Sequence, residues 1–195
     1  MNPTLNAKII FLAASLALAG CASPPEPAAD LAECVFPDAP TESAPLWVCD
    51  SPIEGVELSA VGFAQPSKAG NSFMKQMATA DARVQLAATF KTRVQNMIKQ
   101  YAETTGSADS ETVNRVNTSV SKLITNETLV GSRVFRTRTS PSGGLYVLVG
   151  LDTANVQQAA KDSIQTSMNN DQALWQEFKA KKAHDELAVE ISKMQ

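Results

Sequence analysis

The sequence contains few of the residues that usually build a catalytic or metal centre. It has one histidine and three cysteines among 195 residues, too few for a structural zinc cage, which usually needs four such ligands. It also lacks a strong charge of either sign, because seventeen basic and twenty acidic residues give a net charge of −3. That balance argues against a cationic nucleic-acid binder and against a disordered polyacid. With 44% hydrophobic residues, the chain is typical of one globular domain.

The first apolar run is too short to cross a bilayer, which takes about twenty helical residues. It covers residues 9–19 and follows Lys8, a pattern typical of a signal peptide. It ends in Leu18-Ala19-Gly20-Cys21, which resembles the bacterial lipobox, where the thiol is diacylated and the chain is then cut before the cysteine. We therefore expect a lipoprotein signal peptide over residues 1–20 and a lipid attachment at Cys21. A plain secretory signal with a chance cysteine is the alternative.

The residue after the cysteine bears on the destination of such a lipoprotein. In the lipoproteins that this sequence resembles, an aspartate there retains the protein at the inner membrane. Ala22 stands at that position here. The sequence therefore predicts an outer-membrane protein, lipid-anchored on the periplasmic face.

Residues 21–45 are expected to form the lipidated N-terminus and a proline-rich spacer. They hold six of the ten prolines, and their hydrophobic residues are too scattered to indicate a helix or a strand. Cys34 and Cys49 are an even pair in an oxidising compartment, so we predict a disulfide between them. In the chain-entropy model a loop of this size contributes roughly 3 kcal/mol of stability. A reactive thiol pair is the alternative, although no Cys-x-x-Cys or nearby histidine supports it.

Periodicity predicts an α+β fold with a small three-stranded, mainly antiparallel sheet, in the order β-α-α-β-β-α. Period-two alternation indicates a first strand over residues 56–65. Strands over residues 129–139 and 145–151 flank a Ser-Pro-Ser-Gly-Gly turn, which predicts a hairpin. We expect the strand order first, third, second, with the helices on one face of the sheet.

The helices of this fold are bounded by cap and breaker residues. A long helix is expected from about residue 71 to Gly106, and Asp109 is expected to begin a second one that ends near Leu123. Asp152 caps a third helix from about Ala154, with an interruption near residues 169–170. Residues 169–195 are then expected to form a C-terminal amphipathic helix. On the long helix one apolar stripe is predicted to face the core: Phe73, Met77, Ala80, Val84, Ala87, Val94, Ile98 and Tyr101, widened by Leu86, Phe90 and Met97.

The central strand is expected to have two apolar faces. Alternation sends Leu145, Val147, Val149 and Leu151 toward the helices. Tyr146 and Leu148 then emerge on the opposite face, near Val61 and Phe63. Such a surface is usually covered. The spacer around Trp47, the C-terminal helix with Trp175 and Phe178, a second copy, or an envelope protein partner are the candidate covers.

Together these landmarks resemble the Lpp-twenty family of bacterial envelope lipoproteins. The matching residues are Pro45-Leu46-Trp47, Val61-Gly62-Phe63-Ala64, Ala78, Ala82-Arg83, Leu86-Ala87 and the strand over 146–152 with the helix after it. The resemblance covers roughly residues 45–166 and implies a small α/β domain, here residues 46–168, with no established catalytic residues. One member of that family is a flagellar outer-membrane lipoprotein that assembles into a basal disk.

The shared residues have simple structural interpretations. Gly62 would allow a helix backbone to approach the strand closely, and Ala78, Ala82 and Ala87 would let the first helix lie near the sheet. Trp47 would cover an edge of the core. Arg83 is expected to bond a strand end or a carboxylate such as Asp81 or Asp152.

Candidate chemistry is sparse. His184, the single histidine, is expected on an exposed helix. Ser72 with Lys75 and Ser119 with Lys122 match Ser-x-x-Lys, but the partner motifs of a penicillin-binding enzyme are missing. Arg133, Arg136 and Arg138 are candidates for contacts to lipopolysaccharide phosphates or acidic wall groups, or form a solvated edge strand.

The sequence thus predicts an outer-membrane-anchored periplasmic lipoprotein that acts as a non-catalytic structural or interaction module, with a flagellar role as one option. A regulatory lipoprotein that binds peptidoglycan or a cell-wall synthase is the alternative. We expect no enzyme activity, cofactor, metal or nucleic acid. The expected partners are the membrane, through Cys21, and a second copy or an envelope protein.

Overall fold

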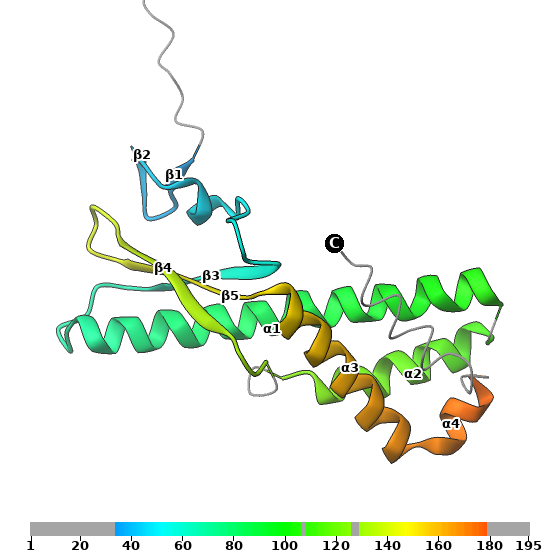
Figure 1. Ribbon diagram of the computed structural model, residues 1–195. Coiled ribbons are helices and arrows are strands. Elements are labelled where there is room, and N and C mark those ends of the chain that lie inside the picture. Colours follow the sequence, from blue (N-terminus) through cyan, green and yellow to red (C-terminus); the bar gives the residue numbers. More distant parts are fainter. Residues whose placement is uncertain (1–33, 107, 126–128, 179–195) are drawn as a thin grey trace, which may run out of the picture. The chain divides into compact units, whose positions relative to one another are not determined.

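The computed structural model describes residues 34–106, 108–125 and 129–178 (Figure 1). Helices and a small antiparallel sheet make up this part of the chain, which confirms the α+β class. In chain order the elements are β1 (Val35–Phe36), β2 (Ala39–Ser43), the 3₁₀ helix η1 (Leu46–Cys49), β3 (Leu58–Ala64), α1 (Asn71–Thr105), α2 (Ser110–Leu123), β4 (Arg133–Thr139), β5 (Leu145–Leu151), α3 (Thr153–Asn170) and α4 (Gln172–Glu177).

The main sheet has the order β3-β5-β4, with both neighbours antiparallel to β5. This confirms the predicted order of first, third and second strand. Every residue of the central strand β5 is buried. The second strand begins later than expected, at Arg133. Gly131 has a φ of 88° and the Ser132 amide donates to the Leu129 carbonyl (3.1 Å), so residues 129–132 turn.

The predicted caps form the helix ends. The Asp109 carboxylate accepts from the Thr112 amide (2.9 Å) at the start of α2, and the Asp152 carboxylate accepts from the Asn155 amide (2.9 Å) at the start of α3. Each cap satisfies one of the amides that a helix N-terminus leaves unpaired. Helix α1 ends at Thr105 and is followed by the C-cap Gly106, which adopts a left-handed conformation. The predicted interruption after residues 169–170 separates α3 from α4.

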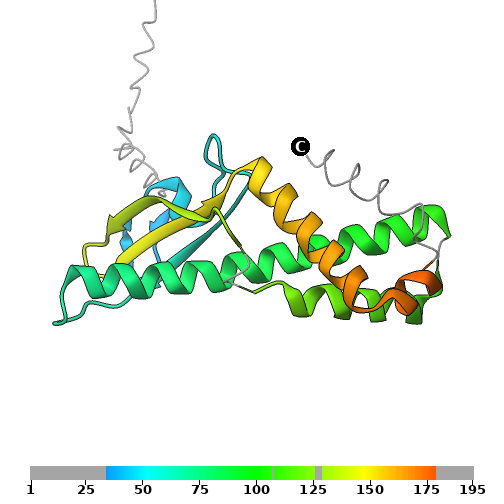
Figure 2. The same cartoon turned by 60° about the horizontal axis from the view of Figure 1, so that its bottom comes forward.

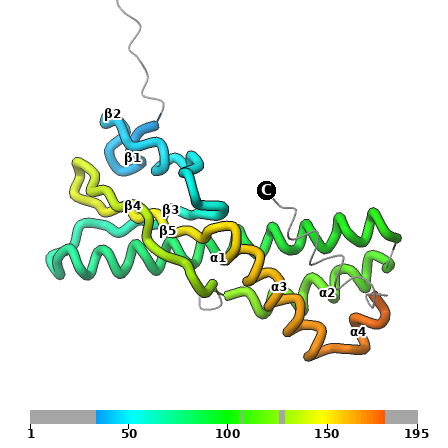
Figure 3. The backbone as a smooth tube through the Cα atoms, in the orientation of Figure 1, coloured from blue at the N-terminus to red at the C-terminus, as the bar shows by residue number. Residues whose placement is uncertain are grey.

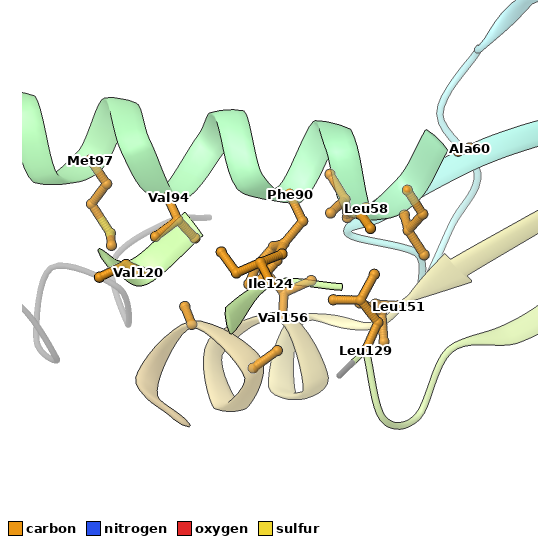
Figure 4. Packing of buried hydrophobic residues seen from close by; sticks show 14 of the residues in the cluster. Leu58, Ala60, Phe90, Val94, Met97, Val120, Ile124, Leu129, Leu151 and Val156 are labelled. Carbon is orange, nitrogen blue, oxygen red and sulfur yellow. The ribbon is translucent and has the colours of Figure 1, made fainter. Parts of the chain in front are cut away.

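Helix α1 is 35 residues long and connects the part of the core that lies on the sheet with the part formed among the helices. Its first half lies along one face of the sheet, against β3 and β5 (Figure 2). Its second half packs with α2, which contacts α3 and α4. Figure 4 shows side chains from α1, the segment after α2 and the start of α3 in one cluster, at Phe90, Ile124 and Val156. Of the described helices, α1 makes the most extensive contact with the sheet.

Gly62 permits this packing, as the sequence suggested. A Cβ atom at residue 62 would overlap the Ala78 carbonyl oxygen and the Ala82 amide nitrogen, and would approach the Ala82 Cβ to 2.8 Å. Ala78 and Ala82 are themselves fully buried. The helix thus lies on β3 at a distance that leaves no room for any side chain at the crossing.

The stripe predicted for α1 is wrong in its first half. Phe73, Met77 and Val84 are 45%, 50% and 59% exposed, and Ala80 is also exposed. The predicted Leu86 and Ala87 are buried, but before them the buried positions are Met74, Ala78 and Ala82. Both sets follow the helical repeat. The small alanines face the sheet because only they fit beside Gly62, and the larger side chains remain on the opposite side of the helix.

We predict that Gly62→Ala destabilises the domain by about 3 kcal/mol, at the upper end of overpacking costs. The added methyl meets the α1 backbone, which cannot move aside as a flexible side chain would. Urea unfolding monitored by circular dichroism measures the loss. Ser59→Ala in the same strand serves as the control and should change stability by less than about 0.5 kcal/mol. A Gly62→Ala protein as stable as the parent would show that helix and strand are not this close.

Candidate functional site

The face of the sheet opposite α1 is covered by the segment before β3 (Figure 3). Strands β1 and β2 form a small antiparallel hairpin, and η1 follows it. The expectation that the proline-rich segment lacks strands is therefore wrong for residues 35–43. Its prolines are compatible with the hairpin because Pro37 lies in the turn and Pro40 on a two-stranded edge. The segment expected to be a spacer thus contributes its distal part to the folded structure.

This hairpin and η1 bury the apolar side chains that the sequence assigned to the second face. Tyr146 is 4% and Leu148 is 1% exposed, and they cluster with Phe36, Trp47 and Val48. Val61 and Phe63 pack partly buried against the same cluster. The rings of Phe63 and Tyr146 lie 4.8 Å apart, centroid to centroid. The four predicted residues are therefore together, but under an internal cover and not open to a partner.

Of the two internal covers considered, the segment around Trp47 is present and the C-terminal one is wrong. Trp175 and Phe178 belong to the other cluster, on the α1 side. There Phe178 packs against Tyr101, with ring centroids 6.2 Å apart, and Trp175 meets Phe178 edge to face.

A disulfide joins Cys34 and Cys49, as predicted, with 6.0 Å between their Cα atoms. It ties the first described residue to the end of η1 and so encloses the hairpin. Cys34 is buried in the cluster that covers β5. The bond therefore holds together the cover itself, since both cysteines lie in it.

Asp38, in the turn of the hairpin, connects this cover to the sheet. Its carboxylate accepts hydrogen bonds from Tyr146 Oη (2.9 Å), Ser140 Oγ (2.6 Å) and Ser142 Oγ. The two serines belong to the turn between β4 and β5. Burial acts to raise the pKa of Asp38, but the hydrogen bonds outweigh it and hold the pKa below its usual value. Burial, with the nearby Asp38 carboxylate, raises the pKa of Tyr146 to about 12.

Sequence reasoning missed Asp38, and it assigned the wrong residue at the edge of β3. There the Phe63 amide donates to Asp81 Oδ2 (2.9 Å), so a carboxylate of α1 satisfies this amide at the strand edge. Arg83, expected to bond a strand end or a carboxylate, has a buried Nε without a hydrogen-bond partner. From the sequence, Asp81 was predicted only as a possible partner of Arg83.

The arginines of β4 lie on one face of the sheet. Arg133, Arg136 and Arg138 are opposite Gly150, Leu148 and Tyr146 of β5. These alternate residues face the hairpin, so the three arginines do so as well. All three are exposed. The guanidinium of Arg133 lies over the Phe135 ring, 4.7 Å from its centroid, and Arg136 donates to the Phe135 carbonyl (3.1 Å).

The remaining candidates show no catalytic arrangement in the part of the chain that the structure describes. Ser72 and Lys75 are exposed near the start of α1. Ser119 Oγ bonds Ser167 Oγ (2.7 Å), which also accepts from Trp175 Nε1 (3.1 Å), so Ser119 belongs to a structural chain of hydrogen bonds. Cys21 and His184 lie outside the described residues.

Two further features concern only the described residues. Within residues 34–106, 108–125 and 129–178, no group of three or more His, Cys, Asp or Glu side chains is placed to hold a metal ion. None of the helices in these ranges is both long and apolar enough to span a membrane.

The family model of the LPP20 lipoprotein matches residues 45–152, more than half of the chain. The chain belongs to the LPP20 lipoprotein family. No curated protein matches it. The matched range of the LPP20 family extends from Pro45, just before η1, to Asp152, the cap of α3. It therefore contains the main sheet, α1 and the Gly62 crossing, but not the hairpin turn with Asp38. Membership indicates an envelope lipoprotein anchored to a membrane.

We predict that Asp38→Asn lowers the free energy of unfolding at pH 7 by about 1–2 kcal/mol. An amide offers one acceptor oxygen and no charge to three hydroxyl donors, and charge-assisted hydrogen bonds are the stronger ones. Asp50→Asn removes the same charge from the same segment and is the matched control. Asp50 has a φ of 60°, a conformation that asparagine adopts well, so the control should stay within about 0.5 kcal/mol.

The stability difference between the parent and Asp38→Asn should depend on pH. Because folding lowers the pKa of Asp38, its contribution is fully present above the unfolded value, about 3.9, and is lost as pH falls through the folded value. The difference should be constant between about pH 5 and 7 and shrink below about pH 4. Urea unfolding of both proteins across this range tests it. A difference that persists unchanged at the lowest pH would mean that the carboxylate charge is not what matters.

Proposed function

We propose that the protein is an outer-membrane lipoprotein, anchored through acyl chains on Cys21, that presents a non-catalytic interaction module to the periplasm. Membership of the LPP20 lipoprotein family is the observation that carries this proposal. The Leu18-Ala19-Gly20-Cys21 motif and the short apolar run before it supply the site of attachment. Several acyl chains would hold the protein durably, because each buried methylene contributes about 0.8 kcal/mol.

The side-chain arrangement supports the non-catalytic part of the proposal. The best-connected polar groups, Asp38 with Ser140 and Ser142, hold the hairpin on the sheet. Within the described residues they form no hydrogen bond with an imidazole or a lysine. A serine nucleophile needs a base within hydrogen-bond reach. Ser119, the other candidate, is bonded to Ser167. Each of these hydroxyls has a structural role.

The disulfide also fits a periplasmic location. Cys34 and Cys49 are joined, and disulfides persist in oxidising compartments such as the bacterial periplasm. Ala22 follows Cys21, at the position where an aspartate would retain such a lipoprotein at the inner membrane. The residue at this position therefore supports transfer to the outer membrane.

We predict that intact-mass analysis of the protein purified from membranes will show an acylated Cys21 as the first residue. Cys21→Ser should leave the precursor uncleaved or release the domain from the membrane fraction, while Ala22→Asp should move the protein toward the inner membrane. Ala22→Ser is the control and should leave fractionation unchanged. An unmodified N-terminus at another residue would refute the lipoprotein assignment, and an Ala22→Asp protein still in the outer membrane would refute only the sorting argument.

A further inference from the structure

The arginine row of β4, Arg133, Arg136 and Arg138, owes its alignment to a bulge. Arg133 and Arg136 are three positions apart, and strict alternation would point them to opposite faces of the sheet. The register shifts between Val134 and Arg136, where Phe135 is the additional residue. A bulge of this kind redirects the side chains that follow it. As a result the row faces one side and spans five residues of β5, Tyr146 to Gly150, or about 14 Å.

The row forms no ion pair in the ranges that the structure describes. The ion pairs there are Arg93 with Glu57 and Arg115 with Glu177, and the row takes part in neither. Asp38, the carboxylate bonded to Tyr146 on this face, accepts from three hydroxyls instead. Three exposed guanidinium groups are therefore available for an anion, and their planar forks match phosphate oxygens well.

Protection of an edge strand does not require this arrangement. Charges on either face of an edge strand discourage pairing with another chain, and a bulge alone also does so. Here the edge strand has both the charged side chains and the bulge, and all three charges point to the same side. The Phe135 ring supports the Arg133 guanidinium, and the Phe135 carbonyl accepts from Arg136. The row is thus partly oriented by its own bulge residue.

The chain enters the fold on the same side as the arginine row. Cys34 and the hairpin cover the face that the row borders. Cys21 precedes Cys34 by thirteen residues, which reach at most about 45 Å when fully extended. Attachment of Cys21 to a membrane would therefore keep Cys34 within about 45 Å of the lipid surface. A tether of this length gives a high effective concentration, so weak contacts are sufficient.

We propose that Arg133, Arg136 and Arg138 bind phosphate groups of anionic lipids in the anchoring membrane and orient the hairpin face toward it. This inference rests on the proposed acylation of Cys21. The ligand is a lipid surface that presents several phosphates at once, because the row spans about 14 Å, further than one phosphate reaches. The outward side of α1 then faces away from the bilayer.

Arginine footprinting on the anchored protein tests the proposal. The acylated protein is placed in nanodiscs of phosphatidylcholine, or of phosphatidylcholine mixed equally with phosphatidylglycerol, and phenylglyoxal modification is followed by peptide mass. The row should react at least threefold more slowly on the anionic discs, whereas Arg115 on α2 should react equally on both. Equal rates for the row would overturn the proposal. Slowing by inorganic phosphate in neutral discs, without slowing by anionic lipid, would also overturn it, because the ligand would then be a free anion.

Variants provide a second readout on the same discs. Amide hydrogen exchange of the exposed hairpin residues 41–43 should slow on anionic discs in the parent protein. The slowing should disappear in Arg133→Gln/Arg136→Gln/Arg138→Gln and persist in Lys75→Gln/Lys99→Gln/Lys122→Gln, which removes the same charge from exposed helix positions. Equal behaviour of the two triple variants would refute a specific role of the row. Intact mass of each preparation reports acylation separately, so an unacylated Cys21 would refute the anchor and unchanged footprints on acylated protein would refute only the arginine row.

Discussion

The contact between α1 and β3 at Gly62 is the constraint on which the remaining packing depends. Because the helix backbone lies where a Cβ would be, the residues beneath it must be small, and Ala78 and Ala82 meet that requirement. The close approach fixes which side of α1 faces the sheet. The same helix then extends past the sheet and supports α2 with Val94, Met97 and Ile98. One crossing thereby sets the orientation of both halves of the core.

The opposite face of the sheet is closed by different means. The cover there is short and has little regular structure, with strands of two and five residues, so its apolar contacts alone bury a modest area. A disulfide limits the conformations of the unfolded segment, and the Asp38 carboxylate bonds the hairpin to Tyr146 and to the β4–β5 turn. Covalent and polar connections thus supplement hydrophobic burial where the cover is thin. Cys34 and Asp38 lie in the segment that composition alone marks as a spacer.

Local signals predicted the order of elements well because caps, breakers and alternation act over a few residues. Asp109, Asp152 and Gly106 ended or began helices as expected. The errors arose where residues far away in the sequence determine which side chains are buried or hydrogen-bonded. The buried side of α1 depends on Gly62 in another element, since Phe73 and Met77 fit the helical repeat as well as Met74 and Ala78 do. Asp38 could not be recognised because Ser140 and Tyr146 lie more than a hundred residues away. The hairpin was not predicted because prolines argue against strands, although they are compatible with a turn.

The two sides of the sheet therefore differ in which of their surfaces remain accessible. On the α1 side the helix packs closely on β3 and β5, whereas Thr137 and Thr139 of β4 remain exposed there. On the hairpin side the cover leaves β4 uncovered at the edge, and the bulge at Phe135 places three charges beside it. The N-terminal part of the described chain, which starts at Cys34, also lies on that side. A protein held by its N-terminus has one side that meets the membrane first. With the anchorage at Cys21 that we propose, positive charge on that side would be attracted to an anionic surface, whereas the exposed Phe73, Met77 and Val84 on the outward side of α1 would remain clear of it.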